Sequence, residues 1–309
     1  MAALNDSFKV TLTPLRNYLN IDIVLKGGRY IATQRQYVEK MLVALGMEEA
    51  NGCRTPCDTT RLEDKTDEED IQPCDKRAYR GIVGQLLWLS GATRPDICYA
   101  VNQLTRHYHE PQSRHMKAAK RVVRYLARTR SLGIDLSGGK ELVAFVDADW
   151  AGDVTTRRSM SGLMVGFARP DGTVAPLAWR SKQQTCVATS SCFAEYAACH
   201  DVSREVFYVR QMCVEMGWIA EDYVVPVFCD NEAAVAIANN TSVKKMSRYI
   251  SIRYHYARWC ADEGVAVFNW VEGSKNLADV FTKPTSIQVF SRCIVRFMVE
   301  VDSGGEEDE

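Results

Sequence analysis

Leu142-Val-Ala-Phe-Val-Asp147-Ala-Asp149-Trp150 runs from five apolar residues into an acid, with a second acid two positions later. A continuous apolar run of this length is typical of a strand that is covered on both faces of its sheet. Ligands of α/β sheets gather beyond the carboxyl ends of such strands. Because strand-end aspartates also serve as turn residues and helix caps, a functional role for Asp147 depends on partners elsewhere in the chain.

Three further acids occupy comparable places downstream. Val224-Val-Pro-Val-Phe-Cys-Asp230 is a second apolar run that ends in aspartate, and a helix-like segment follows it. Glu195 lies in the first turns of an expected amphipathic helix, for which Ser190 and Ser191 are the candidate caps. Asp279 follows the strand-like run 265–271. The sequence thus places its four acids at two strand ends and two helix starts.

Seven segments that include these acids follow one another in order. They are Val146-Asp-Ala-Asp-Trp-Ala-Gly-Asp153, Thr156-Arg-Arg-Ser-Met-Ser-Gly162, Trp179-Arg-Ser-Lys-Gln-Gln-Thr185, Ala194-Glu-Tyr196, Cys229-Asp-Asn231, Ile252-Arg-Tyr-His255 and Leu277-Ala-Asp-Val-Phe-Thr-Lys-Pro284. Together they resemble the ribonuclease H domain at the C-terminal end of copia-type LTR retrotransposon Pol polyproteins. The resemblance extends over nearly the whole chain, from about Phe8 to Pro284.

The resemblance implies a fold and a set of site residues. The implied fold is α/β, a ribonuclease H-like five-stranded mixed sheet with flanking helices, preceded by a smaller α+β thumb and connection region. The strands that carry the first and third acids should be adjacent and parallel. Carried over residue by residue, the family's catalytic and metal-binding acids are Asp147, Glu195, Asp230 and Asp279.

The resemblance and the charge pattern also divide the chain. The expected parts are 1–60 as the end of a reverse transcriptase palm and its thumb, 61–75 as an acidic linker, 76–138 as a basic helical connection region, 139–285 as the ribonuclease H domain, and 286–309 as a C-terminal helix with an acidic tail. Within the first part, the pattern predicts a hairpin over 18–33 and a helix from Gln34 to Leu45. The polymerase's paired aspartates have no counterpart here, so DNA synthesis by this chain alone is not expected.

Four carboxylates suit a metal-dependent hydrolysis. Two divalent ions roughly 3.5 to 4 Å apart can activate a water and stabilise the leaving oxygen of a phosphodiester. Mg²⁺ prefers hard oxygen ligands, so two Mg²⁺ ions are the expected cofactors and Mn²⁺ the expected substitute. Without metal, crowded carboxylates repel one another and some of their pKa values should rise. The expected reaction, which the resemblance supplies, is cleavage of the RNA strand of an RNA–DNA hybrid.

The composition is that of an ordinary globular protein. The chain has 309 residues, of which 46% are hydrophobic and 25% charged, and this length allows two domains. It has no apolar run long enough for a membrane span and no signal-peptide core, which predicts an intracellular location, cytoplasmic or nuclear, without secretion or a membrane partner. The eleven cysteines are scattered and odd in number, which favours reduced thiols. Zinc binding by Cys53, Cys57 and Cys74 is an alternative, but no CxxC pair or nearby histidine supports it.

Basic residues concentrate in the middle of the chain. Residues 76–130 contain twelve bases and two acids, whereas 58–75 is strongly acidic. The expected helix over 116–129 carries much of this charge on one side, which indicates a surface for nucleic-acid phosphates, although a merely solvated helix face is the alternative. The candidate phosphate-binding residues are Lys117, Lys120, Arg121 and Arg124 on this helix, and Arg157, Arg158, Arg180 and Lys182 after strand-like runs near Asp147. Asp149 and Asp153 are candidates for outer-shell, cap or turn roles.

The sequence favours the first of three functions, and the other two remain as alternatives. The first is the hybrid-cleaving nuclease, whose expected partner is an RNA–DNA hybrid, with a reverse transcriptase or integrase module of the same element as a further candidate partner. The second is a catalytically silent nucleic-acid-binding remnant of the element. The third is a DNA nuclease or resolvase of the same fold. No small-molecule substrate is expected.

Overall fold

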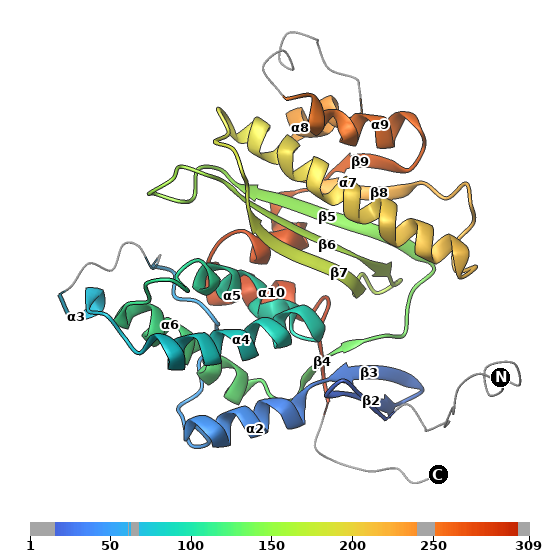
Figure 1. Ribbon diagram of the computed structural model, residues 1–309. Helices are drawn as coiled ribbons and strands as arrows, with labels where there is room; N and C mark the ends of the chain where they lie inside the picture. The colour runs from blue at the N-terminus through green and yellow to red at the C-terminus, as the bar shows by residue number, and fades with distance from the viewer. Residues whose placement is uncertain (1–15, 61, 63–67, 240–250, 302–309) are drawn as a thin grey trace, which may run out of the picture.

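The computed structural model describes residues 16–60, 62, 68–239 and 251–301 of the chain (Figure 1). Within these residues the strands form two five-stranded sheets, with the orders β1-β2-β3-β4-β10 and β7-β6-β5-β8-β9. The expected acidic tail beyond Val301 and the linker residues 61 and 63–67 lie outside the described residues. No helix in the described ranges combines the length and apolar character that a membrane crossing requires.

The second sheet is the mixed sheet that the sequence predicted. In it β5 pairs with β6, and β6 with β7, in antiparallel fashion, while β5–β8 and β8–β9 are parallel. The strands are β5 (Glu141–Asp149), β6 (Met160–Ala168), β7 (Val174–Gln183), β8 (Val225–Cys229) and β9 (Ala266–Trp270). The strand that carries Asp147 and the strand that Asp230 directly follows are therefore adjacent and parallel, as expected.

Helices cover both faces of this sheet. Along β5, Leu142, Ala144 and Val146 pack in one core with the long helix α7 (Ser191–Glu215), while Val143 packs in the other core. Figure 1 shows α7 lying across one face of the strands, with α8 (Glu232–Ala238) and α9 (Tyr256–Asp262) next to it. Ser190 is the cap of α7, since its hydroxyl accepts a hydrogen bond from the Phe193 N–H. Burial on both faces explains the uninterrupted apolar run of β5.

The opposite face is covered by the central helices and by two C-terminal elements. They are α4 (Lys76–Ala92), η2 (Pro95–Ile97), α5 (Cys98–Thr105), α6 (Ser113–Arg128), η5 (Leu277–Phe281) and α10 (Ile287–Ile294). Arg94 is one of the twelve bases of the basic segment 76–130, but it does not lie on a basic surface. Its side chain is only 1% exposed and pairs with Asp96 at 2.7 Å inside this core. A buried guanidinium needs such a partner, so this charge belongs to the fold and is not on the surface.

The N-terminal sheet begins with the predicted hairpin. β2 (Ile21–Lys26) and β3 (Arg29–Thr33) are joined by Gly27 and Gly28, whose φ angles of 55° and 75° are in the left-handed region that glycine adopts readily. The two-residue β1 (Asn17–Tyr18) pairs with β2. The predicted helix follows as α2 (Arg35–Leu45). A short helix, α3 (Glu68–Ile71), lies in the acidic segment.

Two strands from far along the chain complete the N-terminal sheet. β4 (Leu132–Asp135) pairs with β3, and the two-residue β10 (Val299–Glu300) pairs with β4. β4 was not predicted, because 132–135 lies in the region expected to be a helical connection. One core also joins residues from α2, α4, α6, η5 and α10. Buried contacts therefore cross the boundaries expected at 60, 75, 138 and 285. These boundaries remain predictions.

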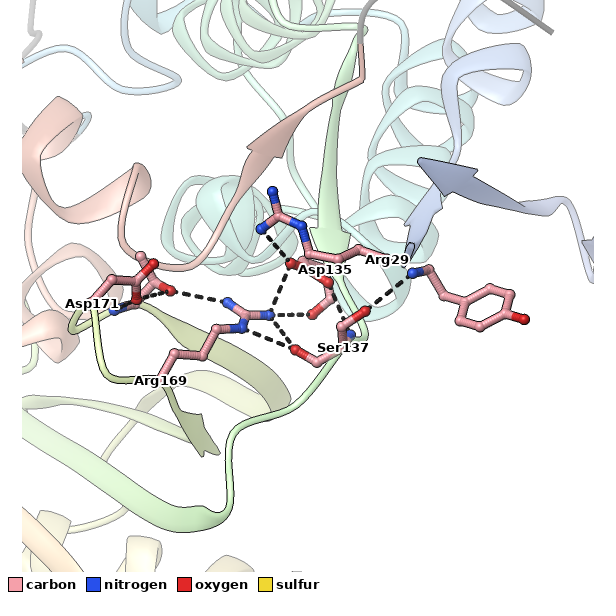
Figure 2. A network of polar contacts seen from close by, with 7 residues as sticks. Arg29, Asp135, Ser137, Arg169 and Asp171 are labelled. Atoms are coloured by element: carbon pink, nitrogen blue, oxygen red, sulfur yellow. Dashed lines mark hydrogen bonds and ion pairs between the residues drawn. The ribbon is translucent and has the colours of Figure 1, made fainter. Parts of the chain in front are cut away.

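A polar network ties the N-terminal sheet to the β6–β7 hairpin (Figure 2). The buried Asp135 carboxylate, at the end of β4, pairs with Arg29 of β3 at 3.2 Å and with Arg169 of the hairpin at 3.1 Å. Arg169 also donates hydrogen bonds to the carbonyl oxygens of Asp135 and Ser137. These contacts hold the chain between β4 and β5 against the mixed sheet.

Candidate active site

The strand register brings Asp147 and Asp230 together. In the parallel β5–β8 pair, Phe145 lies opposite Phe228, and their rings stack with centroids 5.3 Å apart. Asp147 and Asp230 each follow their phenylalanine by two residues. Because side chains two apart point to the same face of a sheet, the two carboxylates project from the same face at neighbouring strand ends.

Asp279 reaches the same place from η5. Gly162 of β6 lies opposite Asp147, and a Cβ atom there would be 2.8 Å from Phe281 Cβ and 2.9 Å from the Ala278 carbonyl oxygen. Glycine at this position therefore lets η5 rest directly on the sheet. The buried Asn276 fixes the start of η5, since its side chain accepts from the Ala278 N–H and donates to the Val146 carbonyl oxygen at 2.9 Å. These contacts set the position of Asp279.

The three aspartates form a compact cluster that also contacts a lysine. One carboxylate oxygen from each of Asp147, Asp230 and Asp279 lies within 4.8 Å of the others. The Lys283 Nζ atom lies 2.8 Å from an Asp279 oxygen and 3.7 Å from an Asp147 oxygen. The Thr282 hydroxyl donates a hydrogen bond to the Asp147 carboxylate. The cluster is thus oriented and partly neutralised by the two residues that follow η5.

Glu195 approaches the cluster from α7. Its buried carboxylate accepts a hydrogen bond from the Ala148 N–H, and the Cys229 Sγ atom lies 3.7 Å from its Oε2 atom. Potential ligand atoms of Glu195, Cys229 and Asp230 also lie within 4.8 Å of one another. Asp230 is therefore common to two groups of potential metal ligands. In the described part of the chain, neither such group includes Cys53, Cys57 or Cys74.

The proton affinities of the site reflect burial and mutual repulsion. Burial raises the pKa of Asp147 to about 6, with Lys283 opposing and Asp279 adding to the rise. Burial and the neighbouring Cys229 and Asp147 raise the pKa of Glu195 well above its usual range. The pKa of Asp230 is also raised, by burial and by Asp279. Burial is thus the main cause of the raised pKa values, and repulsion among the acids adds to it while Lys283 opposes it at Asp147 and Asp230.

The donor set fits divalent magnesium. Carboxylate oxygens are the ligands that Mg²⁺ prefers, and a few of them with waters and a substrate phosphate complete its octahedral coordination. Cys229 is not expected to ligate Mg²⁺, because a hydrogen bond with Cys199 and burial raise the pKa of its thiol. The acids Asp147, Glu195, Asp230 and Asp279 are the residues that would hold the metal.

Two of the predicted phosphate-binding residues lie in the loop between β5 and β6. Arg157 and Arg158 are exposed there. The loop is organised by Asp153, whose buried carboxylate accepts hydrogen bonds from the Thr155 and Thr156 N–H groups and contacts Arg106 of the segment after α5. Asp153 therefore has the turn role that was one of its predicted alternatives.

The other predicted phosphate-binding residues have varied surroundings. On β7, Lys182 is exposed and Arg180 pairs with Glu205 at 2.9 Å. On α6, Lys120 is exposed, whereas the remaining three bases contact the preceding segment. Lys117 pairs with Asp70 at 2.8 Å, Arg121 donates to the Thr55 hydroxyl, and Arg124 donates to the Asn51 carbonyl oxygen. Binding of phosphate by these residues remains a prediction.

Sequence reasoning missed several residues of the site. Thr282, Lys283 and Cys229 were part of recognised motifs but received no role, and Asn276 lies just before one of these motifs. The position of Asn276 just before a helical segment is a cap signal that could have been used. The Lys283 and Cys229 contacts depend on three-dimensional packing and have no comparable local signal.

Comparison with known proteins identifies the relatives of the chain. No family model matches the sequence. The Retrovirus-related Pol polyprotein from transposon RE2 of Arabidopsis thaliana is 35% identical over 278 residues, which cover 88% of this chain and 18% of that protein. The corresponding polyprotein from transposon RE1 of the same plant is 35% identical over 269 residues, covering 84% and 17%. The chain thus spans about a fifth of the length of these polyproteins.

Among solved structures, LC11-RNase H1 in complex with RNA/DNA hybrid aligns with a TM-score of 0.34 and 18% sequence identity. The alignment covers 46% of this chain and 94% of that one. The strand order and the parallel pairing of β5 with β8 match the predicted fold. The long alignments to the transposon polyproteins show that the chain belongs to the family of copia-type retrotransposon Pol polyproteins.

Proposed function

We propose that the chain is a ribonuclease H-type endonuclease that cuts the RNA strand of RNA–DNA hybrids by two-metal hydrolysis. The observation that best supports this is the cluster of Asp147, Asp230 and Asp279, in which one carboxylate oxygen of each lies within 4.8 Å of the others. Two of these acids come from adjacent parallel strands or directly follow one, and the third comes from η5. Glu195 adds a fourth carboxylate beside them. This arrangement concentrates hard oxygen ligands at one point of the surface.

The chain's own residues would prepare the site for its ions. When bound, two Mg²⁺ ions, or Mn²⁺ in their place, would activate a water and stabilise the leaving oxygen. Thr282 keeps the Asp147 carboxylate in one orientation, and Asn276 holds η5 so that Asp279 faces the same point. Lys283 limits repulsion among the carboxylates before the ions arrive.

Substrate binding would rely on basic side chains around the site. Arg157, Arg158, Arg180 and Lys182 are proposed to contact phosphates close to the cleavage point, and Lys117, Lys120, Arg121 and Arg124 to contact the nucleic acid further away. Selection of RNA requires recognition of its 2′-hydroxyl in the minor groove. The proposed place of action is inside the cell, in the cytoplasm or nucleus, alongside a polymerase or integrase module of the same element.

One observation favours a second function, a catalytically silent nucleic-acid-binding module. The Lys283 ammonium already contacts two of the three clustered aspartates. If this cation were not displaced by Mg²⁺, the chain would bind nucleic acid through its basic residues without cutting it. Retention of all four acids argues for the enzyme.

The test is Mg²⁺-dependent cleavage of an RNA–DNA hybrid labelled on the RNA strand, with RNA duplex and DNA duplex as parallel substrates. Asp147→Asn is the inactivating variant, and Asp171→Asn, an exposed aspartate in the β6–β7 turn, is the matched control. Cutting of the hybrid alone, lost in the first variant and kept in the second, supports the proposal. Binding without cleavage favours the silent module, and cutting of DNA duplex favours a DNA nuclease.

A further inference from the structure

A separate cavity lies between α5, α6 and the loop that follows Thr55. Its volume is about 220 Å³. Among the described residues, the charged side chains that line it are Lys117, Arg121 and Arg124, all on α6, and Asp58 on the loop. Cationic groups therefore outnumber acidic ones in the wall, which favours an anionic ligand.

Arg121 offers an unused hydrogen-bond donor in this wall. One terminal nitrogen of its guanidinium donates to the Thr55 hydroxyl at 3.1 Å. Its Nε atom is buried and has no hydrogen-bond partner in the described part of the chain. A buried N–H group without an acceptor is costly, and a guanidinium is well suited to phosphate oxygens.

The remaining wall is largely apolar and contains an aromatic ring. Tyr99 and Leu104 of α5 and Val122 of α6 contribute to it, together with Pro56 and Pro284. The thiol of Cys57 also lines the cavity, and burial raises its pKa to about 12 although Arg121 opposes the rise. The thiol is therefore neutral and adds no negative charge. A planar group that carries a phosphate would complement these surfaces.

The cavity shares part of its wall with a smaller one beside the candidate active site. Both are lined by Pro56, Cys57, Tyr99, Ala100 and Pro284. The smaller cavity also includes Lys283, whose ammonium contacts Asp147 and Asp279. Because the two cavities share five wall residues, the larger cavity lies close to the lysine of the acidic cluster.

We propose that this cavity is a nucleotide-binding site, in which Arg121 and Lys117 bind the phosphate and Tyr99 contacts the base. The volume is below the roughly 300 to 1,000 Å³ of typical small-molecule pockets, so it suits a single nucleotide with part of its sugar at the mouth. The site lies outside the acidic cluster, and the proposal holds whether or not the chain cuts nucleic acid.

The test measures binding of adenosine 5′-monophosphate to the full chain in EDTA by isothermal titration calorimetry. Metal-free conditions keep the acidic cluster from contributing to the signal. We expect saturable binding that Arg121→Gln weakens about tenfold or more, as loss of a hydrogen bond to a charged group predicts. Arg128→Gln, an exposed arginine of the same helix that does not line the cavity, should bind like the wild type. Adenosine and inorganic phosphate should each bind at least about tenfold more weakly than the nucleotide.

Absence of saturable nucleotide binding, or equal binding by Arg121→Gln, would overturn the proposal. Phosphate binding as strong as nucleotide binding would also overturn it, since the site would then recognise only an anion. If Arg121→Gln does not unfold cooperatively, Ala118→Phe replaces it, because Ala118 lines the cavity and the larger ring fills it. Nucleotide binding in a chain that fails to cleave the hybrid would refute the nuclease function and leave this site standing.

Discussion

The Lys283 ammonium lies 2.8 Å from the Asp279 carboxylate, so the acidic cluster is supplied with a cation by its own chain. Lys283→Met removes this charge and keeps a flexible apolar stem. We expect the metal-free variant to be less stable by about 1 kcal/mol, a modest value because Lys283 is partly exposed. Added Mg²⁺ should raise the melting temperature of the variant more than that of the wild type, since the variant's carboxylates are less neutralised. Thermal unfolding with Mg²⁺ and with EDTA measures this rise. If Mg²⁺ raised the melting temperatures of the variant and the wild type equally, Lys283 would not have this role.

The raised pKa of Asp147 predicts how stability depends on pH without metal. Burial raises this pKa to about 6, so the folded chain binds the proton more tightly than the unfolded chain, whose aspartate has a pKa of about 4. The stabilisation that the proton on Asp147 gives to the folded chain is fully present below pH about 4. It is lost as the pH rises through about 6. Asp147→Asn removes this titration.

We therefore expect metal-free Asp147→Asn to be more stable than the wild type at pH 7.5, by up to about 3 kcal/mol, and nearly equal to it at low pH. Urea unfolding in EDTA at several pH values measures the difference. The same variant should gain less stability from Mg²⁺, because one ligand is lost. A constant difference across the pH range would contradict the predicted titration.

Asp153 is expected to control substrate binding through the β5–β6 loop. Asp153→Ala removes the acceptor for two loop N–H groups and the partner of Arg106, which should lower stability by about 2 kcal/mol. It also frees the loop that carries Arg157 and Arg158. For the proposed hybrid cleavage, KM should rise about tenfold while kcat changes little, since the acids are untouched. A fall in kcat with unchanged KM would show that the loop acts on chemistry instead.

Asp135 is expected to couple the two sheets. Asp135→Asn removes the charge that two arginines share in Figure 2, and loss of a buried ion-pair partner costs about 3 kcal/mol or more. Amide hydrogen exchange in β3 and β4 should become faster while α7 changes little. Asp222→Asn, at an exposed aspartate between α7 and β8 outside this network, is the control. Uniform acceleration over the whole chain would indicate global destabilisation and not loss of coupling.

The parts of the site that follow from strand patterns could be predicted. Asp147 and Asp230 end apolar runs of adjacent strands, and the register places them side by side. Glu195 and Asp279 required the family resemblance, because helix-start acids are common. The Lys283 and Cys229 contacts could not be predicted, since each depends on how close two elements pack and no local pattern reports that distance.

Surface charge was harder to predict than the fold. Arg94 is buried, and three bases of α6 contact the segment before them, although composition alone suggested an open basic surface. Charge counts along a sequence do not show which charges are paired. In the same way, β4 escaped prediction because its partners β3 and β10 lie about a hundred residues or more away in the chain, and pairing at such a separation leaves no local periodicity.

The N-terminal sheet is complete only when β10 pairs with the edge of β4. The other four strands of this sheet precede every strand of the mixed sheet in the chain. During translation, β4 is therefore synthesised long before β10, the strand that covers its edge. An uncovered edge strand is a template for pairing with other chains. The last residues of β10 thus protect a segment made some 160 residues earlier, and shortening the chain before Val299 should promote aggregation during synthesis even though every carboxylate of the acidic cluster is retained.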